Sequence, residues 1–416
     1  MGVLEATFAV ATGRRLKIAY VVDIFDDNAA GAVQSSRRFV EGLRQRHDVT
    51  VISTGASHVG KVCVPRQRIL GFQWIIEKNG FAFGSPAADI LRQALPGHDV
   101  VYIHYTLPLG YSALREARKL GMPVVFGQHF QPQNVFYNLR INWPWLNNAL
   151  ARFFVRNFYN RADHVVCPSR HALQELEQHG FSGAASIISN GLPRRFAPRI
   201  YPRPERFKNR FVILMVSRLA REKRHELVLR AIARSPHRHN ILLVATGQGP
   251  VQGLIEKLAR KHAIACEVGY VDDAQLLEFY NTADLMVHAS EAELEGMAVL
   301  EAIGCGLPAL IAQAKNSATS QFAIDERFLF PAGDVAALQE RIDHWIEHPE
   351  SLHVTGREYL AKSRGFGFAD ALQELEGLLL RLAGYSAPVI DVGTRVARQE
   401  SIDQQLAPRS LGQAHG

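Results

Sequence analysis

Two glutamates around a glycine-containing turn are the residues of this chain best suited to hold a hydroxyl-rich or phosphate-bearing ligand. Glu293 and Glu301 lie in the stretch DLMVHASEAELEGMAVLEAIGCGLP. We expect a strand before the turn and a helix after it, and the first N–H groups of a helix bind anions. Carboxylates at this point can accept hydrogen bonds from sugar hydroxyls. An acidic first turn that only caps a helix would give the same pattern, and the residues alone leave both readings open.

A pair of cations follows another expected strand, in the motif VSRLAREK. Arg218 comes directly after the strand and Lys223 follows five residues later. A guanidinium binds phosphate oxygens through two parallel hydrogen bonds, and a lysine adds a point charge. Because Arg221 and Arg224 interleave with them, the alternative is a solvated basic surface. The position after an apolar strand favours phosphate binding.

Three glycines and one histidine also stand at expected strand ends. Gly247 and Gly249 close a strand in ATGQGP, where glycine permits a tight turn and a close approach of backbone to a ligand. Gly31 lies between a strand and a helix, where its loop could lie against a diphosphate, although the segment lacks the full dinucleotide-binding glycine pattern. His129, in GQHFQPQN, follows the strand PVVFG and could orient a hydroxyl or stabilise developing charge. For each glycine, an ordinary loop is the alternative.

The segment FYNLRINWPWLNNALARFFVRNFYNR combines aromatic and basic side chains. Such a mixture suits the interfacial zone of a membrane. The alternative is that the aromatic rings pack into a protein core and only the arginines are exposed. We expect this segment to contact a membrane surface through Trp143, Trp145, Arg152, Phe153 and Arg156.

Length and composition limit the remaining possibilities. The chain has 416 residues, 47% hydrophobic and 21% charged, which predicts a globular protein of two domains. Its net charge of +7 indicates anionic partners, and without a nucleic-acid-binding motif we expect small anions or lipid headgroups rather than nucleic acid. The apolar runs are too short to span a bilayer, and the N-terminal charges follow the weak apolar stretch, unlike a signal peptide. Four scattered cysteines predict neither a metal site nor disulfides, so we expect a cytoplasmic protein.

Apolar strand-like runs alternate with amphipathic segments along most of the chain. This alternation predicts α/β architecture with parallel sheets, in two Rossmann-like lobes with a cleft between them. The expected strands cover residues 16–23, 49–54, 100–104, 123–127, 164–169, 211–217, 241–246, 284–290 and 307–312.

Composition also places the domain boundaries. Residues 1–192 form the expected N-terminal lobe, and the proline- and arginine-rich residues 193–210 form a linker. Residues 211–366 form the expected C-terminal lobe. A helix over 367–389 is expected to pack back on the N-terminal lobe, and the polar residues 390–416 are expected to be disordered.

Four motifs, taken in their order along the chain, resemble those of the family-four retaining glycosyltransferases of GT-B fold. They are VSRLAREK, GQGP, GYVDDAQLLEFYNTADLMVHAS and ELEGMAVLEAIGCGLP. The resemblance covers about residues 16–385 and is most specific in the second half. It implies that the lobe of residues 1–192 binds the acceptor and that the lobe of residues 211–366 binds the nucleotide sugar, with Arg218 and Lys223 holding the diphosphate of this donor. It implies sugar contacts from Glu293 and from the backbone at Gly296, Met297 and Ala298, ribose contact from Glu301, and a position near the reacting centre for His129.

The sequence departs from the family pattern at Leu294-Glu295-Gly296, where many members have Gly-Phe-Gly, and the extra carboxylate of Glu295 leaves the sugar contacts open. Three segments resemble the sequences of the family branch that glucosylates diacylglycerol. They are ELEGMAVLEAIGCGLPALI, NSATSQFAIDERFLF and QPQNVFYN. This narrower resemblance implies a UDP-sugar donor, with glucose expected, a membrane-lipid acceptor, no metal, and a position on the inner face of the cell membrane.

Two alternatives stay open at this point. One is a glycosyltransferase acting on a soluble or polyprenyl-linked saccharide, as in cell-surface polysaccharide synthesis. The other is a nucleotide-sugar-binding protein without turnover. Intact Arg218, Lys223, Glu293 and Glu301 argue against the second.

Overall fold

The computed structural model describes residues 15–26, 31–68, 82–131 and 143–386, and these divide into two compact units. Unit 1 contains the described residues up to Gly191 together with those from Phe368 onward. Unit 2 contains Leu192–Gly367. The expected tail, residues 390–416, and most of the segment QPQNVFYN lie outside the described residues.

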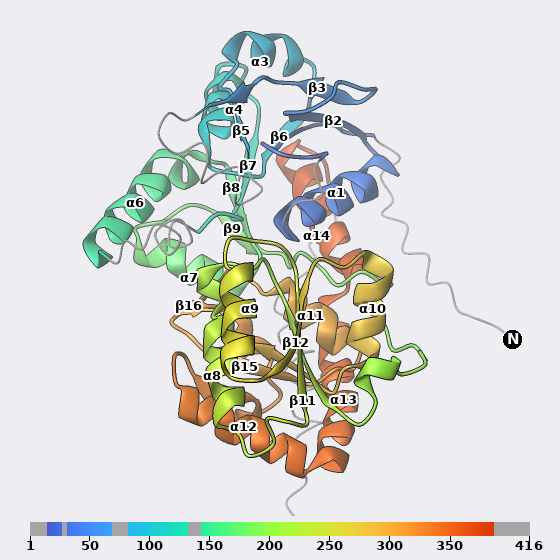
Figure 1. Ribbon diagram of the computed structural model, residues 1–416. Coiled ribbons are helices and arrows are strands. Elements are labelled where there is room, and N and C mark those ends of the chain that lie inside the picture. The colour runs from blue at the N-terminus through green and yellow to red at the C-terminus, as the bar shows by residue number, and fades with distance from the viewer. Residues whose placement is uncertain (1–14, 27–30, 69–81, 132–142, 387–416) are drawn as a thin grey trace, which may run out of the picture. The chain divides into compact units, whose positions relative to one another are not determined.

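Unit 1 is built on a seven-stranded parallel sheet (Figure 1). Its strand order is β3-β2-β1-β6-β7-β8-β9. The strands are β1 (Lys17–Val21), β2 (Asp48–Ser53), β3 (Lys61–Cys63), β6 (Val100–Ile103), β7 (Val124–Gly127), β8 (His164–Cys167) and β9 (Ala185–Ile187). A separate antiparallel pair consists of β4 (Arg66–Gln67) and β5 (Phe83–Gly84).

Unit 1 also contains the helices α1 (Gly31–Arg44), α3 (Ala88–Ala94), α4 (Pro108–Lys119), α6 (Pro144–Asn157), α7 (Arg170–Gln178) and α14 (Phe368–Leu382). Of these, α1, α4 and α7 contact strands of this sheet, while α3 contacts α4 and α14 contacts α1. The core beneath them includes Tyr20 and Tyr102, whose rings stack with their centroids 4.8 Å apart.

Unit 2 is built on a six-stranded parallel sheet with the order β12-β11-β10-β13-β15-β17. The strands are β10 (Phe211–Val216), β11 (Ile241–Thr246), β12 (Ala265–Gly269), β13 (Leu285–His288), β15 (Ala309–Gln313) and β17 (Leu329–Pro331). Two short strands, β14 (Ala292–Glu293) and β16 (Asn316–Ser317), pair in parallel beside it. Its helices are α8 (His225–Arg234), α9 (Gln252–Lys261), α10 (Asp273–Thr282), α11 (Met297–Gly304), α12 (Val335–Glu347) and α13 (Pro349–Ser363).

Both sheets reverse their strand order at one point, and this reversal decides where a ligand can be held. In unit 1, β2 and β3 are added on one side of β1, and the chain then returns to add β6 on the other side of β1. In unit 2, β11 and β12 are added on one side of β10, and β13 is added on the other. The loops after the two strands at the reversal diverge to opposite faces, so that ligands of such sheets bind at their carboxyl ends. The α/β fold with two Rossmann-like units, expected from the sequence, is confirmed.

All nine expected strands are present, with ends shifted by at most two residues. Four strands of the two main sheets were not expected, namely β3 and β9 at the edges of the first sheet and β12 and β17 at the edges of the second, and neither were the short pairs β4–β5 and β14–β16. Central parallel strands are buried on both faces and form continuous apolar runs, which makes them visible in a sequence. The edge strand β12 is only half-buried along its whole length and contains Glu267, so its sequence carries no such run.

The proline-rich segment expected as a linker, residues 193–210, is grouped with unit 2. Phe196 and Phe207 from this segment are buried in the unit 2 core. The guanidinium of Arg203 donates to both carboxylate oxygens of Asp284, at 3.1 and 2.7 Å. These contacts fix the segment against the sheet of unit 2.

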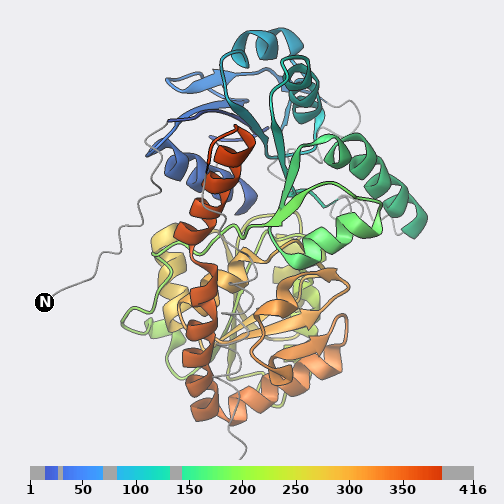
Figure 2. The ribbon, with the colours of Figure 1, turned by 180° about the vertical axis from the view of Figure 1, so that it is seen from behind.

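Helix α14 lies at the far end of the chain yet belongs to unit 1, where it packs beside α1 (Figures 1 and 2). Its buried leucines belong to the same core cluster as Phe39 and Leu43 of α1, and the two helices are in contact. Glu376 of α14 also binds His47, just after α1. The Nδ1 of His47 accepts from the Leu16 N–H at 3.2 Å, so Nε2 carries the proton and donates to Glu376 at 3.0 Å.

No helix among the described residues is both long enough and apolar enough to cross a bilayer.

Replacing one buried leucine of α14 tests whether unit 1 needs this helix. Leu379 is fully buried, and we expect Leu379→Ala to lower the unfolding free energy of unit 1 by about 2–5 kcal/mol through lost burial and a cavity. Urea unfolding followed by circular dichroism measures the loss. The control, Gln373→Ala on the same helix, removes a half-buried polar side chain and should cost much less. Equal effects of the two variants would contradict the packing described here.

Candidate functional site

The expected donor-binding residues come from loops after β10, β11 and β13, at the carboxyl edge of the unit 2 sheet. Arg218 and Lys223 follow β10, Gly247 and Gly249 follow β11, and Glu293 follows β13. Because β10 and β13 flank the reversal of strand order, their loops meet where a nucleotide binds in such sheets.

Backbone hydrogen bonds join the first two loops tightly. The Leu219 N–H donates to the Gln248 carbonyl at 2.8 Å, and the Val251 N–H donates to the Leu219 carbonyl at 3.1 Å. This approach requires glycine at both expected positions. A Cβ at Gly247 would lie 1.9 Å from the Ser217 carbonyl oxygen, and one at Gly249 would lie 2.3 Å from the Leu219 oxygen. The two glycines therefore position the loop that carries Arg218.

Arg218 is held by a carboxylate that the sequence did not single out. Its guanidinium donates to Glu222 Oε1 at 2.6 Å, and Glu222 is completely buried. Since leaving a charged group unpaired in such a place is costly, this ion pair fixes one side of the guanidinium. The Glu291 N–H, after β13, donates to the Glu222 carbonyl at 2.9 Å and ties the two loops together.

Lys223 and Glu293, predicted separately as a phosphate ligand and a sugar ligand, are in direct contact. The Lys223 ammonium donates to Glu293 Oε1 and lies 3.5 Å from the Ser290 hydroxyl. The Nε2 atom of His288 lies 3.2 Å from the same carboxylate oxygen. Both charged side chains are mostly, but not fully, removed from solvent.

The charge states at this pair follow from burial and proximity. Burial by itself would raise the pKa of the Glu293 carboxyl, but Lys223 and His288 together outweigh burial and hold this pKa well below its usual range. Burial lowers the pKa of His225 to about 3, and the positive charge of Lys223 adds to the effect. Glu293 is therefore ionised and His225 neutral near pH 7.

Glu293 leads into the start of helix α11 through a glycine with a positive φ. Gly296 has φ 96°, and a Cβ there would lie 2.2 Å from the Thr319 methyl carbon. The helix then begins with Met297 and Ala298, whose N–H groups have no carbonyl partner within the helix. The strand pair β14–β16 holds this turn, because the Ala318 N–H donates to the Glu293 carbonyl at 2.9 Å.

Glu301, predicted as the ribose ligand, lies one turn into α11. The hydroxyl of Tyr280, from α10, donates to Glu301 Oε2 at 3.1 Å. Burial raises the pKa of Tyr280, and the carboxylate of Glu301 raises it further, so the phenol keeps its proton and remains a donor. Glu295, the residue that departs from the family pattern, is buried.

His129 and Gly31 lie in unit 1. Gly31 is the first residue of α1, and residues 27–30 before it lie outside the described residues. His129 follows β7 and stacks on His104, with the ring centroids 3.9 Å apart. Burial lowers the pKa of His129 to about 3, so the ring is neutral near pH 7. Its Nε2 is buried and has no hydrogen-bond partner among the described residues.

The residues predicted to contact a membrane lie on or next to helix α6 and are exposed, whereas other aromatic residues of the same segment are buried. Trp143, Trp145 and Phe153 are 57%, 66% and 53% exposed, and Arg152 and Arg156 are exposed beside them. The two tryptophan rings stack, 6.1 Å apart. The core-packing alternative holds for other members of the aromatic segment, since Phe158 and Tyr159 are buried. Phe136 and Tyr137 lie outside the described residues.

Sequence reasoning missed the residues that hold the predicted ones in place, namely Glu222, Tyr280, His288 and Ser290. His288 and Ser290 do carry a signal, because they are polar residues at the end of an apolar strand. Glu222 looks like one charge within a charged run, and Tyr280 looks like a core aromatic, so neither could be recognised without its partner.

Comparisons with known proteins agree with this architecture. Residues 198–359 match the family model described as Glycosyl transferases group 1, and residues 29–196 match Glycosyltransferase Family 4. An α-monoglucosyldiacylglycerol synthase of Streptococcus pneumoniae is 23% identical over 71% of this chain and 70% of its own length. A GDP-mannose-dependent α-mannosyltransferase of Mycolicibacterium smegmatis is 26% identical over 71% of this chain and 79% of its own.

Among solved structures, Anabaena HepE in complex with UDP and glucose is similar with a TM-score of 0.70. The similarity covers 88% of this chain and 99% of HepE at 17% identity, and it concerns the fold. Two family models matched in succession, over two parallel-sheet units, identify the chain as a member of the family-four glycosyltransferases with the GT-B fold.

Proposed function

We propose that this glycosyltransferase moves a hexose, glucose in the first instance, from a UDP-sugar to the hydroxyl of a membrane lipid such as diacylglycerol, with retention of anomeric configuration. The observation that carries the transfer chemistry is the contact of Lys223 with Glu293 at the strand-order reversal of unit 2. Two similar proteins named as monoglucosyldiacylglycerol synthases support the acceptor. HepE, solved with UDP-glucose, supports the donor.

The donor is proposed to bind with its diphosphate beside Arg218 and Lys223. Gly247 and Gly249 bring backbone close to the nucleotide, and Glu301 accepts from the ribose hydroxyls. The Lys223 ammonium turns from Glu293 toward a phosphate oxygen. Glu293 then accepts hydrogen bonds from hydroxyls of the sugar, so that one ion pair supplies a contact to each half of the donor.

In the proposed reaction the acceptor hydroxyl oxygen attacks the anomeric carbon on the face from which the diphosphate leaves. The bond between that carbon and the phosphate oxygen breaks, and its electron pair passes to the phosphate. The hydroxyl proton moves to the same departing oxygen, which gives UDP and the glycoside with retained configuration. Arg218, Lys223 and the first N–H groups of α11, at Met297 and Ala298, stabilise the growing negative charge.

His129 is proposed to contact a hydroxyl of the reacting sugar as a neutral ring. A pKa of about 3 makes protonation at neutral pH unfavourable, so the ring serves as a hydrogen-bonding group that needs no proton from solution. No metal is required in this scheme, because the two cationic side chains occupy the place that Mg²⁺ takes in other phosphate-handling sites.

The lipid part of the proposal depends on helix α6. Its exposed tryptophans suit a bilayer interface, and each arginine near an anionic leaflet contributes about 1 kcal/mol of binding. We propose that this face, with Trp143, Trp145, Arg152, Phe153 and Arg156, attaches the enzyme peripherally to the inner face of the cell membrane.

Incubation of the purified protein with UDP-glucose, UDP-galactose or GDP-mannose, together with diacylglycerol in anionic vesicles, tests the function directly. We expect glucosyldiacylglycerol in the α configuration, identified by mass spectrometry and proton NMR. A product formed only from GDP-mannose would contradict the donor. Turnover restricted to soluble saccharides, with the protein left in the supernatant after sedimentation of the vesicles, would contradict the acceptor and favour the saccharide alternative.

Removing the Lys223 ammonium separates catalysis from folding. We expect Lys223→Ala to lower kcat by about 10²–10³-fold, because charge on the leaving diphosphate loses its partner. The melting temperature should fall as well, because Glu293 loses its ion-pair partner, but the protein should remain folded. Steady-state UDP release and thermal melting measure both. The control is Arg221→Ala, which removes an exposed cation from the same short helix, residues 221–223, and should retain activity. Near-normal turnover by Lys223→Ala would overturn the phosphate assignment.

The neutral state of His129 predicts a pH effect on stability. Between pH 3 and 6.5 the unfolded chain binds a proton at this position that the folded chain does not, so acidification across this window favours unfolding. His129→Gln should therefore lose less stability than the wild type between about pH 7.5 and about pH 4.5. Urea unfolding at the two pH values measures the difference. Parallel losses in both proteins would show that His129 titrates normally in the folded state.

A further inference from the structure

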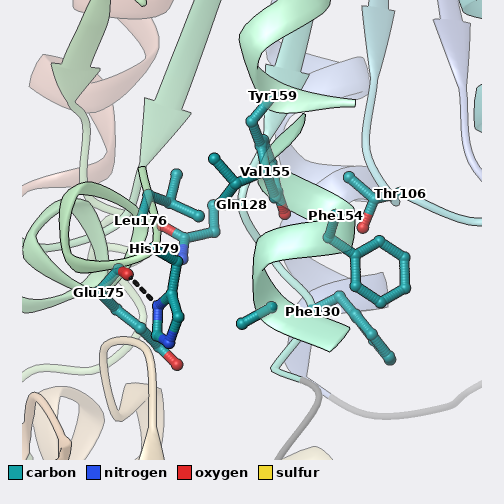
Figure 3. Close-up of a pocket in the computed structure, with 10 residues that line it drawn as sticks. Thr106, Gln128, Phe130, Phe154, Val155, Tyr159, Glu175, Leu176 and His179 are labelled. Atoms are coloured by element: carbon teal, nitrogen blue, oxygen red, sulfur yellow. Dashed lines mark hydrogen bonds between the residues drawn. The ribbon is translucent and has the colours of Figure 1, made fainter. Parts of the chain in front are cut away.

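A small cavity in unit 1 lies between α6 and α7 and is lined by Thr106, Gln128 and Tyr159, among others (Figure 3). Its volume is about 20 Å³, which is enough for about one water molecule. A single water can donate to the buried Gln128 carbonyl oxygen, which has no hydrogen-bond partner among the described residues. The cavity therefore needs no organic ligand, and the buried polar group with a functional consequence lies in unit 2.

That group is the imidazole of His288, the last residue of the central strand β13. The strand fixes the backbone here, since His288 is paired in register with Ile311 of β15. The side chain is only 5% exposed, and its Nε2 lies 3.2 Å from Glu293 Oε1. Nε2 nevertheless makes no hydrogen bond of good geometry within the part of the chain that the structure describes. Because buried polar atoms nearly always have partners, this nitrogen is one whose full hydrogen bond belongs to another state of the site.

The oxygen nearest to His288 is already taken by another donor. Glu293 Oε1 accepts from the Lys223 ammonium, and Lys223 and His288 are the two side chains of the described residues that contact this carboxylate. The two differ in freedom of movement. A lysine carries its charge on a flexible four-carbon stem, whereas an imidazole on a paired strand turns about only two bonds. Lys223 can therefore swing away from Glu293 while His288 stays beside it.

Departure of Lys223 would be costly if no other donor were present. The side chain of Glu293 is 19% exposed, and an ionised carboxylate that is mostly buried needs a partner. Movement of Lys223 toward a phosphate creates this situation. A second N–H beside the same oxygen removes the problem, because it can complete its hydrogen bond once the ammonium has gone. His225, another buried imidazole of this region, is engaged elsewhere, with its Nε2 3.2 Å from the Ser217 hydroxyl.

We propose that His288 is a positioning residue whose Nε2–H donates to Glu293 Oε1 when Lys223 moves to the diphosphate of the donor. The inference rests on the proposed function and deepens it, since it explains how the ion pair opens at low cost. The imidazole then holds the carboxylate in the orientation that receives the hydroxyls of the sugar. While Lys223 remains on Glu293, His288 contributes little, and its effect emerges only after the ammonium has left.

Binding of UDP alone tests this role, because no sugar hydroxyl then replaces the ammonium at Glu293. We expect His288→Leu, which removes the N–H, to weaken UDP binding about tenfold or more in isothermal titration calorimetry. The matched variant His288→Gln places an amide N–H close to the position of Nε2 and should retain most of the affinity. UDP-glucose should lose less affinity than UDP in His288→Leu, since its hydroxyls donate to Glu293. Equal losses in the Leu and Gln variants would contradict a role for the N–H.

A background without the charge of Glu293 separates positioning from packing. Glu293→Gln leaves no carboxylate to hold, so adding His288→Leu should change UDP affinity by less than about twofold. The full loss in this background would show that His288 acts through packing alone and would overturn the proposal. If His288→Leu does not fold, His288→Met serves as the variant without an N–H.

A stability measurement requires no donor and keeps this inference distinguishable from the proposed function. Lys223→Ala imitates departure of the ammonium, so His288→Leu should lower the melting temperature more in that background than in the wild type. Additive shifts would refute this inference alone, even in a protein that binds UDP and transfers sugar. Non-additive shifts in a protein that binds neither UDP nor UDP-glucose would refute the proposed donor alone.

Discussion

The contact between Lys223 and Glu293 is the interaction on which the candidate site of unit 2 depends. It forms because the sheet reverses its strand order between β10 and β13, which brings a loop from each strand to one place. Neither residue is near the other in sequence. The carboxylate offsets the cost of burying the ammonium, and the ammonium with His288 keeps the carboxyl ionised. The pair therefore maintains two opposite charges in a place that would otherwise exclude both.

The backbone around this pair also holds the charged side chains in position. Gly247 and Gly249 let two loops approach until their main chains hydrogen-bond, which places Arg218 against the buried Glu222. Gly296 turns the chain so that α11 starts directly after Glu293. The site is thus built mainly from main-chain geometry, and side chains supply the charges. Such an arrangement is preorganised, since little rearrangement is needed when charge develops on a ligand.

Features set by the local sequence, such as central strands and the residues at their ends, could be predicted. Residues whose role depends on contacts with distant parts of the chain could not. Central strands such as Ile241–Thr246 were found because burial on both faces makes them continuously apolar, whereas the half-buried edge strand Ala265–Gly269 was not. The placement of Arg218 and Glu293 at the carboxyl edge of the unit 2 sheet could be predicted because both follow apolar strands, and their roles in binding stay predictions. Glu222 was missed because only the folded chain shows that it is buried against Arg218. Phe196 and Phe207 were likewise assigned to a linker, since proline density hides their packing.

Helix α6 presents two different chemistries on adjacent residues. Ala151 faces inward and Arg152 faces outward because successive residues of a helix are separated by about 100° of rotation. Inner positions can change without altering the charge or aromatic content that the helix shows to its surroundings, and outer positions can change without altering internal packing. The two faces of α6 can therefore change independently during evolution, so that related proteins could differ in internal packing while keeping the same exposed aromatic and basic side chains, or the reverse.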